Sequence, residues 1–275
     1  MRGFFTPLLR PVLYYIFPDD CRVCGKRLTD VSRVPVCALC LREPQPLVAE
    51  FACRTCRTPF VNRFALDENG ECALCRLGLK GFDAVYSYGS YEGGLRTLIH
   101  LFKFEKVHTL ARPLAGYMAR VLPREKQFDC VVPMPLHWRR RWQRGFNQSE
   151  LLANEIGRRW NAPVRRAVRR TRATAPQSGL TNAKRRANVR GVFGLARGLF
   201  SRKPVSLKDQ RILLIDDVLT TGATAAACAR VLKRAGAKHV TLLTVARTDR
   251  RLNVFEELAG IQVNVQTNAA AGGTR

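Results

Sequence analysis

The sequence predicts an α/β protein whose mostly parallel sheet is flanked by helices and preceded by a small cysteine-rich segment. Three observations predict it. From Gly81 onward, strand-like apolar runs alternate with helical patterns; eight regularly spaced cysteines come before that point; and one apolar run leads into two aspartates and a small polar loop. Strands that alternate with helices favour a parallel sheet with right-handed crossovers. A chain of 275 residues can hold one medium domain and a smaller unit.

The elements are expected in a regular order after the cysteines. Alternating or continuous apolar runs predict strands, and apolar residues three and four apart predict helices. The strands are expected at 84–91, 128–133, 163–168, 212–215 and 239–246, and the helices at 95–104, 110–122, 147–160 and 223–235. Residues 171–190 are polar and basic, and the pattern weakens beyond Thr248. The predicted divisions are a docking segment at 1–19, a cysteine-rich unit at 20–80, an α/β domain at 81–250 and a C-terminal extension at 251–275.

The first residues are apolar, but Pro7, Arg10 and Pro11 interrupt them. The run is too short and too broken to cross a bilayer, and it has no small-residue cleavage site. We expect it to pack on the protein, with contact to a membrane surface as the alternative. The chain is therefore expected to be cytoplasmic and not an integral membrane protein.

Eight cysteines form four C-x-x-C pairs: Cys21/Cys24, Cys37/Cys40, Cys53/Cys56 and Cys72/Cys75. Two such turns can supply the four thiolates of a closed tetrahedral zinc site, so the four pairs predict two structural zinc ions. Sequential pairing would give two tandem zinc ribbons, and spacing alone also allows interleaved pairing. Disulfides would need an oxidising compartment, and redox chemistry would not need four pairs. The unpaired Cys130 and Cys228 are expected in the core.

The formal net charge of +26 is concentrated in one region. Residues 139–203 contain 18 Lys and Arg but only Glu150 and Glu155. This excess favours a polyanionic partner, and a solvated basic face is the alternative. The candidate DNA-binding residues are Arg139, Arg140, Arg141, Lys184, Arg185 and Arg186.

The stretch RILLIDDVLTTGAT at 211–224 carries the main functional signal. Hydroxyl residues around Gly222, followed by a helix, form the kind of turn that holds a phosphate. Asp216 and Asp217 would repel that anion but suit sugar hydroxyls or Mg²⁺. A phosphorylated ribose satisfies both halves. A plain turn with two solvated acids is the structural alternative.

This stretch resembles the phosphoribosyl-pyrophosphate signature of type I phosphoribosyltransferases. Together with the cysteine pairs, three further stretches resemble the ComF family of competence proteins, which includes ComFC and the GntX-type DNA-utilisation proteins. These stretches are LIHLFKFE at 98–105, RRWQRGFNQSELLA at 140–153 and RRTRATAPQSGLTNAKRRANVRGVF at 169–193. The similarity runs from about Pro18 to Arg247.

The resemblance implies a type I phosphoribosyltransferase fold and roles for individual residues. Asp216 and Asp217 would be catalytic and would bind the ribose hydroxyls. The 5′-phosphate would lie on Thr220, Thr221, Gly222, Ala223 and Thr224, and the diphosphate or its Mg²⁺ on Lys103, Arg144, Asn147 and Gln148. A mobile loop would carry Arg172, Gln177 and Asn188.

Three functions remain open from the sequence. The favoured one is a phosphoribosyltransferase-like enzyme that binds phosphoribosyl pyrophosphate or ribose 5-phosphate with Mg²⁺, has an unidentified acceptor, and handles single-stranded DNA. A non-catalytic DNA-binding adaptor on the same scaffold is the second, and a nucleobase salvage enzyme is the third. The family resemblance also implies contact with a DNA-translocating helicase and an inner-membrane channel.

Overall fold

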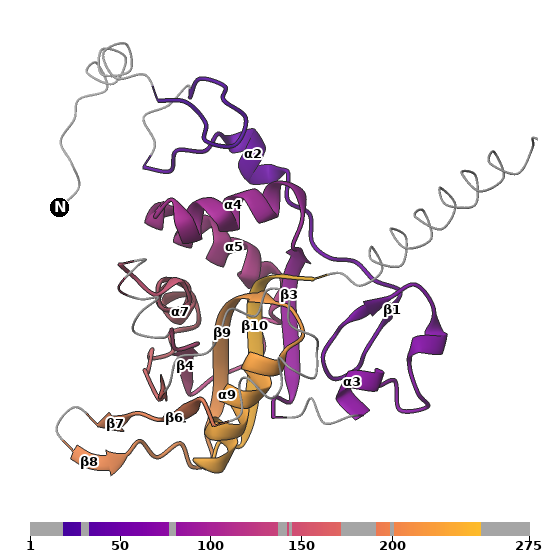
Figure 1. Ribbon diagram of the computed structural model, residues 1–275, viewed down its shortest axis with the longest axis vertical. Helices are drawn as coiled ribbons and strands as arrows, with labels where there is room; N and C mark the ends of the chain where they lie inside the picture. Colours follow the sequence, from indigo (N-terminus) through magenta and orange to yellow (C-terminus); the bar gives the residue numbers. More distant parts are fainter. Residues whose placement is uncertain are drawn as a thin grey trace, which may run out of the picture.

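The computed structural model describes residues 19–28, 33–76, 81–136, 142, 145–171, 191–198 and 201–248. Its centre is a four-stranded parallel sheet in the order β3-β10-β9-β4 (Figure 1). The strands are β3 Ala84–Ser90, β4 Cys130–Pro133, β9 Arg211–Leu219 and β10 His239–Arg247. The parallel α/β fold predicted from the alternating pattern is confirmed.

Helices cover both faces of this sheet. They are α4 Gly93–Phe104, α5 Ala111–Val121, α7 Gln148–Trp160 and α9 Ala223–Arg234, with a 3-10 turn at His108–Leu110 before α5. The predicted helices agree with these bounds to within a few residues. Apolar residues on one side of each helix face the sheet, which is the pattern from which they were predicted.

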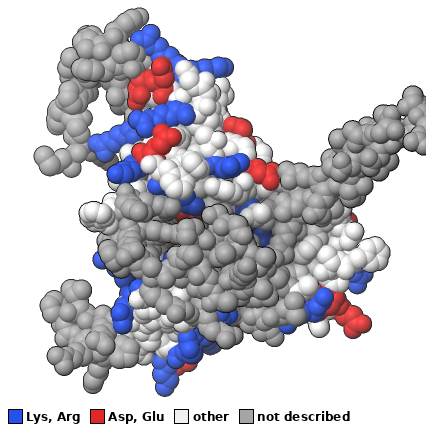
Figure 2. Space-filling model, in the orientation of Figure 1, with Lys and Arg blue, Asp and Glu red and all other residues white. Residues whose placement is uncertain are grey.

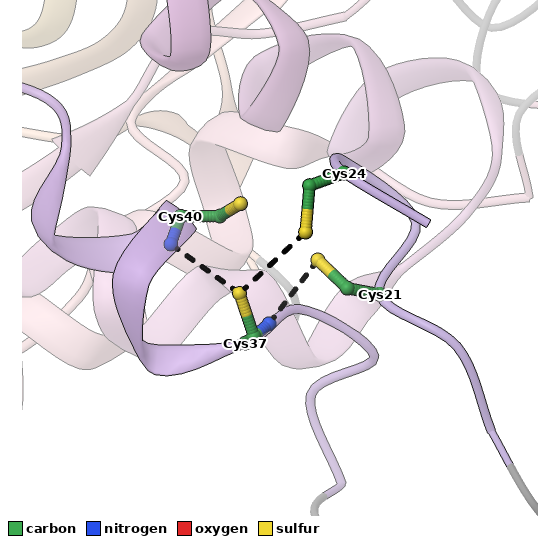
Figure 3. Close-up of side chains that lie close together, drawn as sticks. All are labelled: Cys21, Cys24, Cys37 and Cys40. Carbon is green, nitrogen blue, oxygen red and sulfur yellow. Dashed lines mark hydrogen bonds between the residues drawn. The ribbon is translucent and has the colours of Figure 1, made fainter. Parts of the chain in front are cut away.

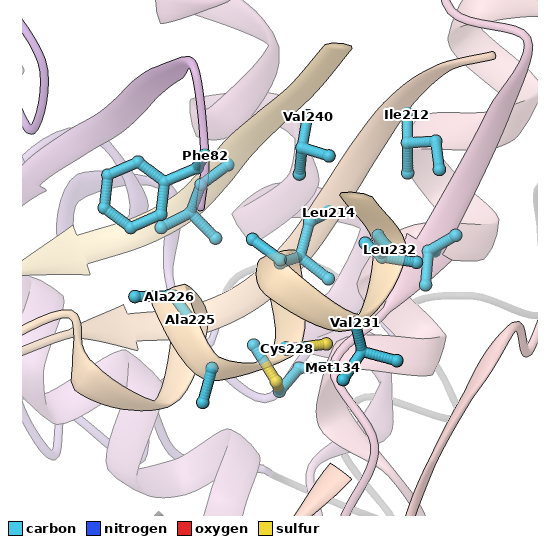
Figure 4. Close-up of a cluster of buried hydrophobic side chains, with 14 of the residues drawn as sticks. Phe82, Met134, Ile212, Leu214, Ala225, Ala226, Cys228, Val231, Leu232 and Val240 are labelled. Carbon is cyan, nitrogen blue, oxygen red and sulfur yellow. The ribbon is translucent and has the colours of Figure 1, made fainter. Parts of the chain in front are cut away.

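Alternate residues of the strands build two separate cores, because successive side chains point to opposite faces of a sheet. One core lies between the sheet and α9, where Ile212, Leu214 and Val240 meet Cys228 and Leu232 (Figure 4). The other lies under α4, α5 and α7, where Leu213, Ile215 and Leu243 meet side chains of those helices. Cys130 and Cys228 are fully buried, as predicted.

Short elements occupy the rest of the described chain. They are α2 Ala38–Arg42, β1 Phe51–Ala52, β2 Pro59–Phe60, a 3-10 turn at Arg63–Ala65, α3 Ala73–Arg76, β5 Val168–Arg170, β6 Phe193–Leu195, β7 Arg197–Gly198 and β8 Ser201–Pro204. The strand expected at 163–168 is largely wrong: Val164 makes only an isolated bridge to Val131, and β5 begins at Val168. The hairpin β5-β6 joins segments on either side of residues 172–190, a pairing that local periodicity does not reveal.

The two cysteine segments dock on different parts of the sheet domain. The first, with α2, lies beside α4 and α5, and the second, with β1 and α3, lies beside β3 (Figure 1). Cys21 and Cys40 belong to the core under α4 and α5, and Cys53 and Cys75 belong to the core on the α9 side. In the part of the chain that the structure describes, no helix combines the length and apolarity needed to cross a membrane.

Candidate functional site

Asp216 and Asp217 lie inside β9, three and two residues before its end at Leu219. The prediction that the strand ends at Ile215 is therefore wrong. Register pairing with β10 continues to the pair Leu219 and Arg247, so the neighbouring strand extends β9 past the apolar run. Because side chains alternate along a strand, the two carboxylates leave the sheet on opposite faces.

Asp217 faces the helix that carries Lys103. The Nζ atom of Lys103 lies 3.0 Å from a carboxylate oxygen of Asp217, and both side chains are nearly buried, with 13% and 14% of their surface exposed. The same ammonium lies 5.9 Å from the centre of the Tyr91 ring. The structure thus brings Lys103, 113 positions before Asp216, to the acidic pair.

Asp216 has an unusual protonation equilibrium. Burial, with a further contribution from the charge of Asp217, raises the pKa of Asp216 to about 7. The backbone N–H of Asp217 donates to its Oδ1 atom at 2.9 Å and the hydroxyl of Ser149 donates to the same atom at 3.1 Å, which partly offsets the increase. The carboxyl therefore changes charge near neutral pH, as groups at functional sites often do.

The start of α7 meets the end of β9 through Ser149, which sequence reasoning missed. Asn147 caps this helix: its side-chain oxygen accepts from the N–H of Ser149 at 3.2 Å, and its Nδ2 donates to the carbonyl of Met134 at 3.1 Å. The triplet Asn-Gln-Ser was a usable signal, because Asn and Ser are preferred where a helix begins and their side chains bond to groups there.

Gln148 supplies a donor at the same place. Its side chain is buried, with 2% of the residue exposed, and its Nε2 atom has no hydrogen-bond partner among the described residues. A buried donor without an acceptor costs roughly 1–3 kcal/mol, so such a group is expected where a ligand completes the bond. Asn147 and Gln148 therefore lie at the start of α7, directly before Ser149, which contacts Asp216.

The predicted phosphate loop is the turn between β9 and α9. Gly222 precedes the first helical residue with φ 77° and ψ −1°, in the left-handed region that glycine adopts without strain. The N–H of Ala223 contacts the Thr221 hydroxyl at 3.5 Å. Thr220 and Thr224 flank this turn, so the N-terminal end of α9 faces the space beyond the strand.

Other predicted residues fall outside the described part of the chain. These are Arg139, Arg140, Arg141, Arg144, Arg172, Gln177, Lys184, Arg185, Arg186 and Asn188.

The first cysteine cluster contains Cys21, Cys24, Cys37 and Cys40, whose sulfurs point toward a common centre (Figure 3). The four Sγ atoms lie within 4.8 Å of one another, and those of Cys24 and Cys37 are 3.9 Å apart. With Zn–S bonds of about 2.3 Å, a tetrahedral site has sulfur–sulfur edges of about 3.8 Å. Backbone N–H groups of Cys37 and Cys40 also point at sulfurs, which suits thiolate ligands. These residues fit a zinc ion.

The second cluster contains Cys53, Cys56, Cys72 and Cys75. Two of its sulfur–sulfur distances, Cys53 to Cys75 and Cys56 to Cys72, are 3.7 Å, and the N–H of Cys72 points at the sulfur of Cys53. These distances also match the edge of about 3.8 Å of a tetrahedral zinc site, so the second cluster fits a zinc ion as well. Sequential pairing of the four C-x-x-C turns, which the sequence favoured, is confirmed.

Arg247 ties the second cluster to the sheet. It ends β10, is 2% exposed, and donates to the carbonyl of Cys56 at 2.7 Å and to the hydroxyl of Thr58 at 2.5 Å. Its own carbonyl accepts from the N–H of Tyr91, the residue whose ring lies near Lys103. The second cluster is thereby joined to the strand ends that carry the acidic pair.

Comparison with known proteins agrees with this geometry. The family model "Phosphoribosyl transferase domain" matches residues 147–261. The DNA utilization protein YhgH of Escherichia coli K12 is 30% identical over 241 residues, which cover 84% of this chain and 98% of that protein. Competence protein F of Haemophilus influenzae is 32% identical over 184 residues, covering 64% and 78%. Competence protein ComFC of Bacillus subtilis is 29% identical over 246 residues, covering 86% and 88%.

Proposed function

The chain belongs to the ComF family of competence and DNA-utilisation proteins and carries a phosphoribosyltransferase domain, and on that premise we propose that it binds phosphoribosyl pyrophosphate with Mg²⁺ and acts on, or beside, single-stranded DNA. The proposed reaction is phosphoribosyl transfer to an acceptor that is still to be identified. The proposed compartment is the cytoplasm, where internalised DNA would be met.

One observation carries the sugar-phosphate half of the proposal. Two carboxylates at the end of a parallel strand share their surroundings with a lysine, an orphaned buried amide and the start of a helix. Ligands of open parallel sheets bind at the carboxyl ends of the strands. We assign the 5′-phosphate to the turn at 220–224, the ribose hydroxyls to Asp216 and Asp217, and the diphosphate to Lys103 and Gln148.

In the proposed reaction these residues stabilise the charges that develop in the transition state. As pyrophosphate leaves C1 of the ribose, positive charge develops on the sugar and negative charge on the leaving group. Asp216 and Asp217 would steady the sugar, and Lys103 would exchange its bond to Asp217 for one to the diphosphate. Mg²⁺, when bound, supplies further neutralisation of the leaving group through oxygen ligands.

The DNA half rests on the relatives and on charge. YhgH is named for DNA utilisation and ComFC for competence. The net charge of +26 favours a polyanion. Contact with a helicase and a membrane channel stays a proposal from family resemblance. An adaptor that binds DNA without turnover is the second candidate, favoured by the charge alone.

Calorimetric titration of phosphoribosyl pyrophosphate with Mg²⁺ tests the sugar-phosphate site. We expect binding by the zinc-loaded protein and at least a hundredfold loss in Asp216→Asn/Asp217→Asn. Glu155→Gln is the matched control, because this acid makes only a surface ion pair with Arg158 on α7. Wild-type protein that binds no phosphoribosyl pyrophosphate would contradict the proposal and leave the adaptor.

The raised pKa of Asp216 adds a pH test. A ligand that needs the carboxylate must release the proton that Asp216 holds below about pH 7. Affinity for phosphoribosyl pyrophosphate should therefore rise with a slope near one proton around pH 6 and level off by about pH 8. Buffers of different ionisation heat should report the release of this proton. A flat profile would show that Asp216 does not change charge on binding.

A further inference from the structure

A surface hollow beside α5 is lined by five cationic side chains and by no acidic side chain. Its volume is about 1160 Å³, and its walls come from the first cysteine segment at Val34 and Leu41, from α5, and from the C-terminal end of α7 at Trp160. We call it the basic groove, defined by Arg112, Arg120, Arg124, Lys126 and Arg159.

The groove is distant from the acidic pair. Asn147 and Gln148 begin α7 near Asp216, whereas Arg159 lies near the end of that helix. Twelve helical steps from Asn147 to Arg159 span about 18 Å. Lys126 precedes β4, so it lies at the amino ends of the strands, opposite the ends that carry the acids. The two places are therefore separate sites.

No acidic side chain of the groove lining neutralises the five cations. None of the residues that line it is acidic, and its five cations take part in no ion pair among the described residues. The nearby Glu125 does not line it, and Glu155 is paired with Arg158. Elsewhere the charges are mixed: Figure 2 shows acidic and basic side chains close together over the upper part of the face that it draws. A concave wall of one sign concentrates counter-ions of the other.

Three of these cations, Arg120, Lys126 and Arg159, lie against neighbouring groups. The guanidinium of Arg120 lies 5.7 Å from the centre of the Tyr117 ring, and Lys126 lies 5.4 Å from that of Tyr86. A terminal nitrogen of Arg159 lies 3.8 Å from where Gly116 would carry a Cβ, so this side chain extends from α7 to the surface of α5. Cations held before binding lose less freedom when a ligand arrives.

Tyr117 makes the wall itself firm. Its ring stacks on Tyr88 with centroids 4.8 Å apart, and its hydroxyl donates to the carbonyl of Leu41 in the first cysteine segment. Burial raises the pKa of Tyr117 to about 12, so the hydroxyl stays a donor at all physiological pH values. The first cluster thus fixes one side of the groove.

The layout fits an elongated anion. Arg112 and Arg120 are eight residues apart on α5, which places their backbones about 12 Å apart along the helix axis. Two phosphodiesters of one strand can meet these two guanidinium groups separately. The half-buried Trp160 adds an aromatic edge beside these charges. A base of a single strand can stack on such an edge, whereas the bases of a duplex are already stacked on one another.

We propose that the basic groove binds the backbone of single-stranded nucleic acid. This inference rests on the proposed function and deepens it, because it gives the DNA partner a surface other than the basic stretch 139–203. Phosphates would lie along the groove cations, with the strand running over the first cysteine segment and α5.

Fluorescence anisotropy with a labelled oligothymidylate of about 20 nucleotides tests the groove. The variant is Arg120→Gln/Arg124→Gln/Arg159→Gln. The control is Arg63→Gln/Lys208→Gln/Arg234→Gln, which removes three exposed cations outside the groove. Each phosphate contact on a single strand contributes about 0.7 to the slope of log affinity against log salt, so the groove variant should lose about 2 from that slope and at least tenfold in affinity. The control should keep both values, and both variants should bind phosphoribosyl pyrophosphate as the wild type does.

The other outcomes separate the two proposals. If the wild type binds the oligonucleotide and both variants lose affinity equally, the groove is not the binding surface. The proposed function would then remain in place. A wild type that binds no oligonucleotide would remove the DNA half of the proposed function together with the groove. Equal affinity for duplex, or a variant that loses only binding to anionic lipid vesicles, would overturn the assignment to a single strand.

Discussion

The two cysteine clusters share one sequence signature but are built into the molecule differently. In the first, Cys24 is exposed and Cys37 half-buried, and the segment is attached to the sheet domain through hydrogen bonds from Tyr117 and Tyr88. In the second, all four cysteines are buried in the core shared with α9. The comparison teaches that C-x-x-C spacing predicts the metal site but not how much of the fold depends on it.

Loss of the second cluster should have the largest effect. A structural zinc site contributes on the order of 10 kcal/mol, which is comparable to the whole stability of a domain. Cys53→Ser/Cys72→Ser should therefore abolish cooperative unfolding of the sheet domain, measured by circular dichroism on heating, and with it binding of phosphoribosyl pyrophosphate. A variant that melts like the wild type would mean that the core on the α9 side stands without this metal.

Removal of Arg247 should come next. Arg247→Met leaves the Cys56 carbonyl and the Thr58 hydroxyl without their donor, and hydrogen bonds from charged groups contribute roughly 1.5–3 kcal/mol each. We expect a loss of about 3 kcal/mol in chemical denaturation and a zinc content that stays at two ions per chain. Arg234→Met, an exposed change on α9, is the control. Loss of one zinc ion would show that Arg247 holds the cluster itself.

The first cluster should matter less to global stability. Cys24→Ser/Cys37→Ser should lower the zinc content by one ion and the melting temperature by only a few degrees, because α4 and α5 keep most of their own core. The same variant should weaken oligonucleotide binding, since Val34 and Leu41 form one wall of the basic groove. A melting curve like that of Cys53→Ser/Cys72→Ser would erase the contrast between the clusters.

The smallest effect is expected for Tyr117→Phe, which tests how the first cluster is attached to the sheet domain compared with the second. Tyr117→Phe removes one hydroxyl and leaves the carbonyl of Leu41 without this donor, so unfolding free energy should fall by about 1 kcal/mol. The groove wall should also become more mobile. Amide hydrogen exchange should then speed up, relative to the wild type, more in residues 33–42 than in residues 51–60. An equal change of exchange rate in both segments would show that Tyr117 does not hold the first cluster against the sheet domain.

The sequence predicted the fold and both cysteine clusters, because both depend on local pattern, whereas the assigned roles of the site residues stay predictions. Apolar periodicity placed the long helices, and cysteine spacing placed both clusters. The end of β9 was misplaced because pairing with β10 is a non-local contact, and Asp216 within a strand contradicts local propensity. Ser149 and Arg247 escaped notice because each acts through a partner distant in sequence.

The bonds of Arg247 also have a consequence for synthesis. They join residues separated by 191 and 189 positions, and β3 pairs only with β10 in the described sheet. At roughly 5–20 residues per second, the ribosome needs on the order of ten seconds or more to pass from Cys75 to Arg247. The second cluster can collect its metal early, but it can dock only after β10 and Arg247 have been synthesised. Ribosome-bound chains that stop before 239 should therefore keep residues 51–76 open to protease, and the released chain of 275 residues should protect them.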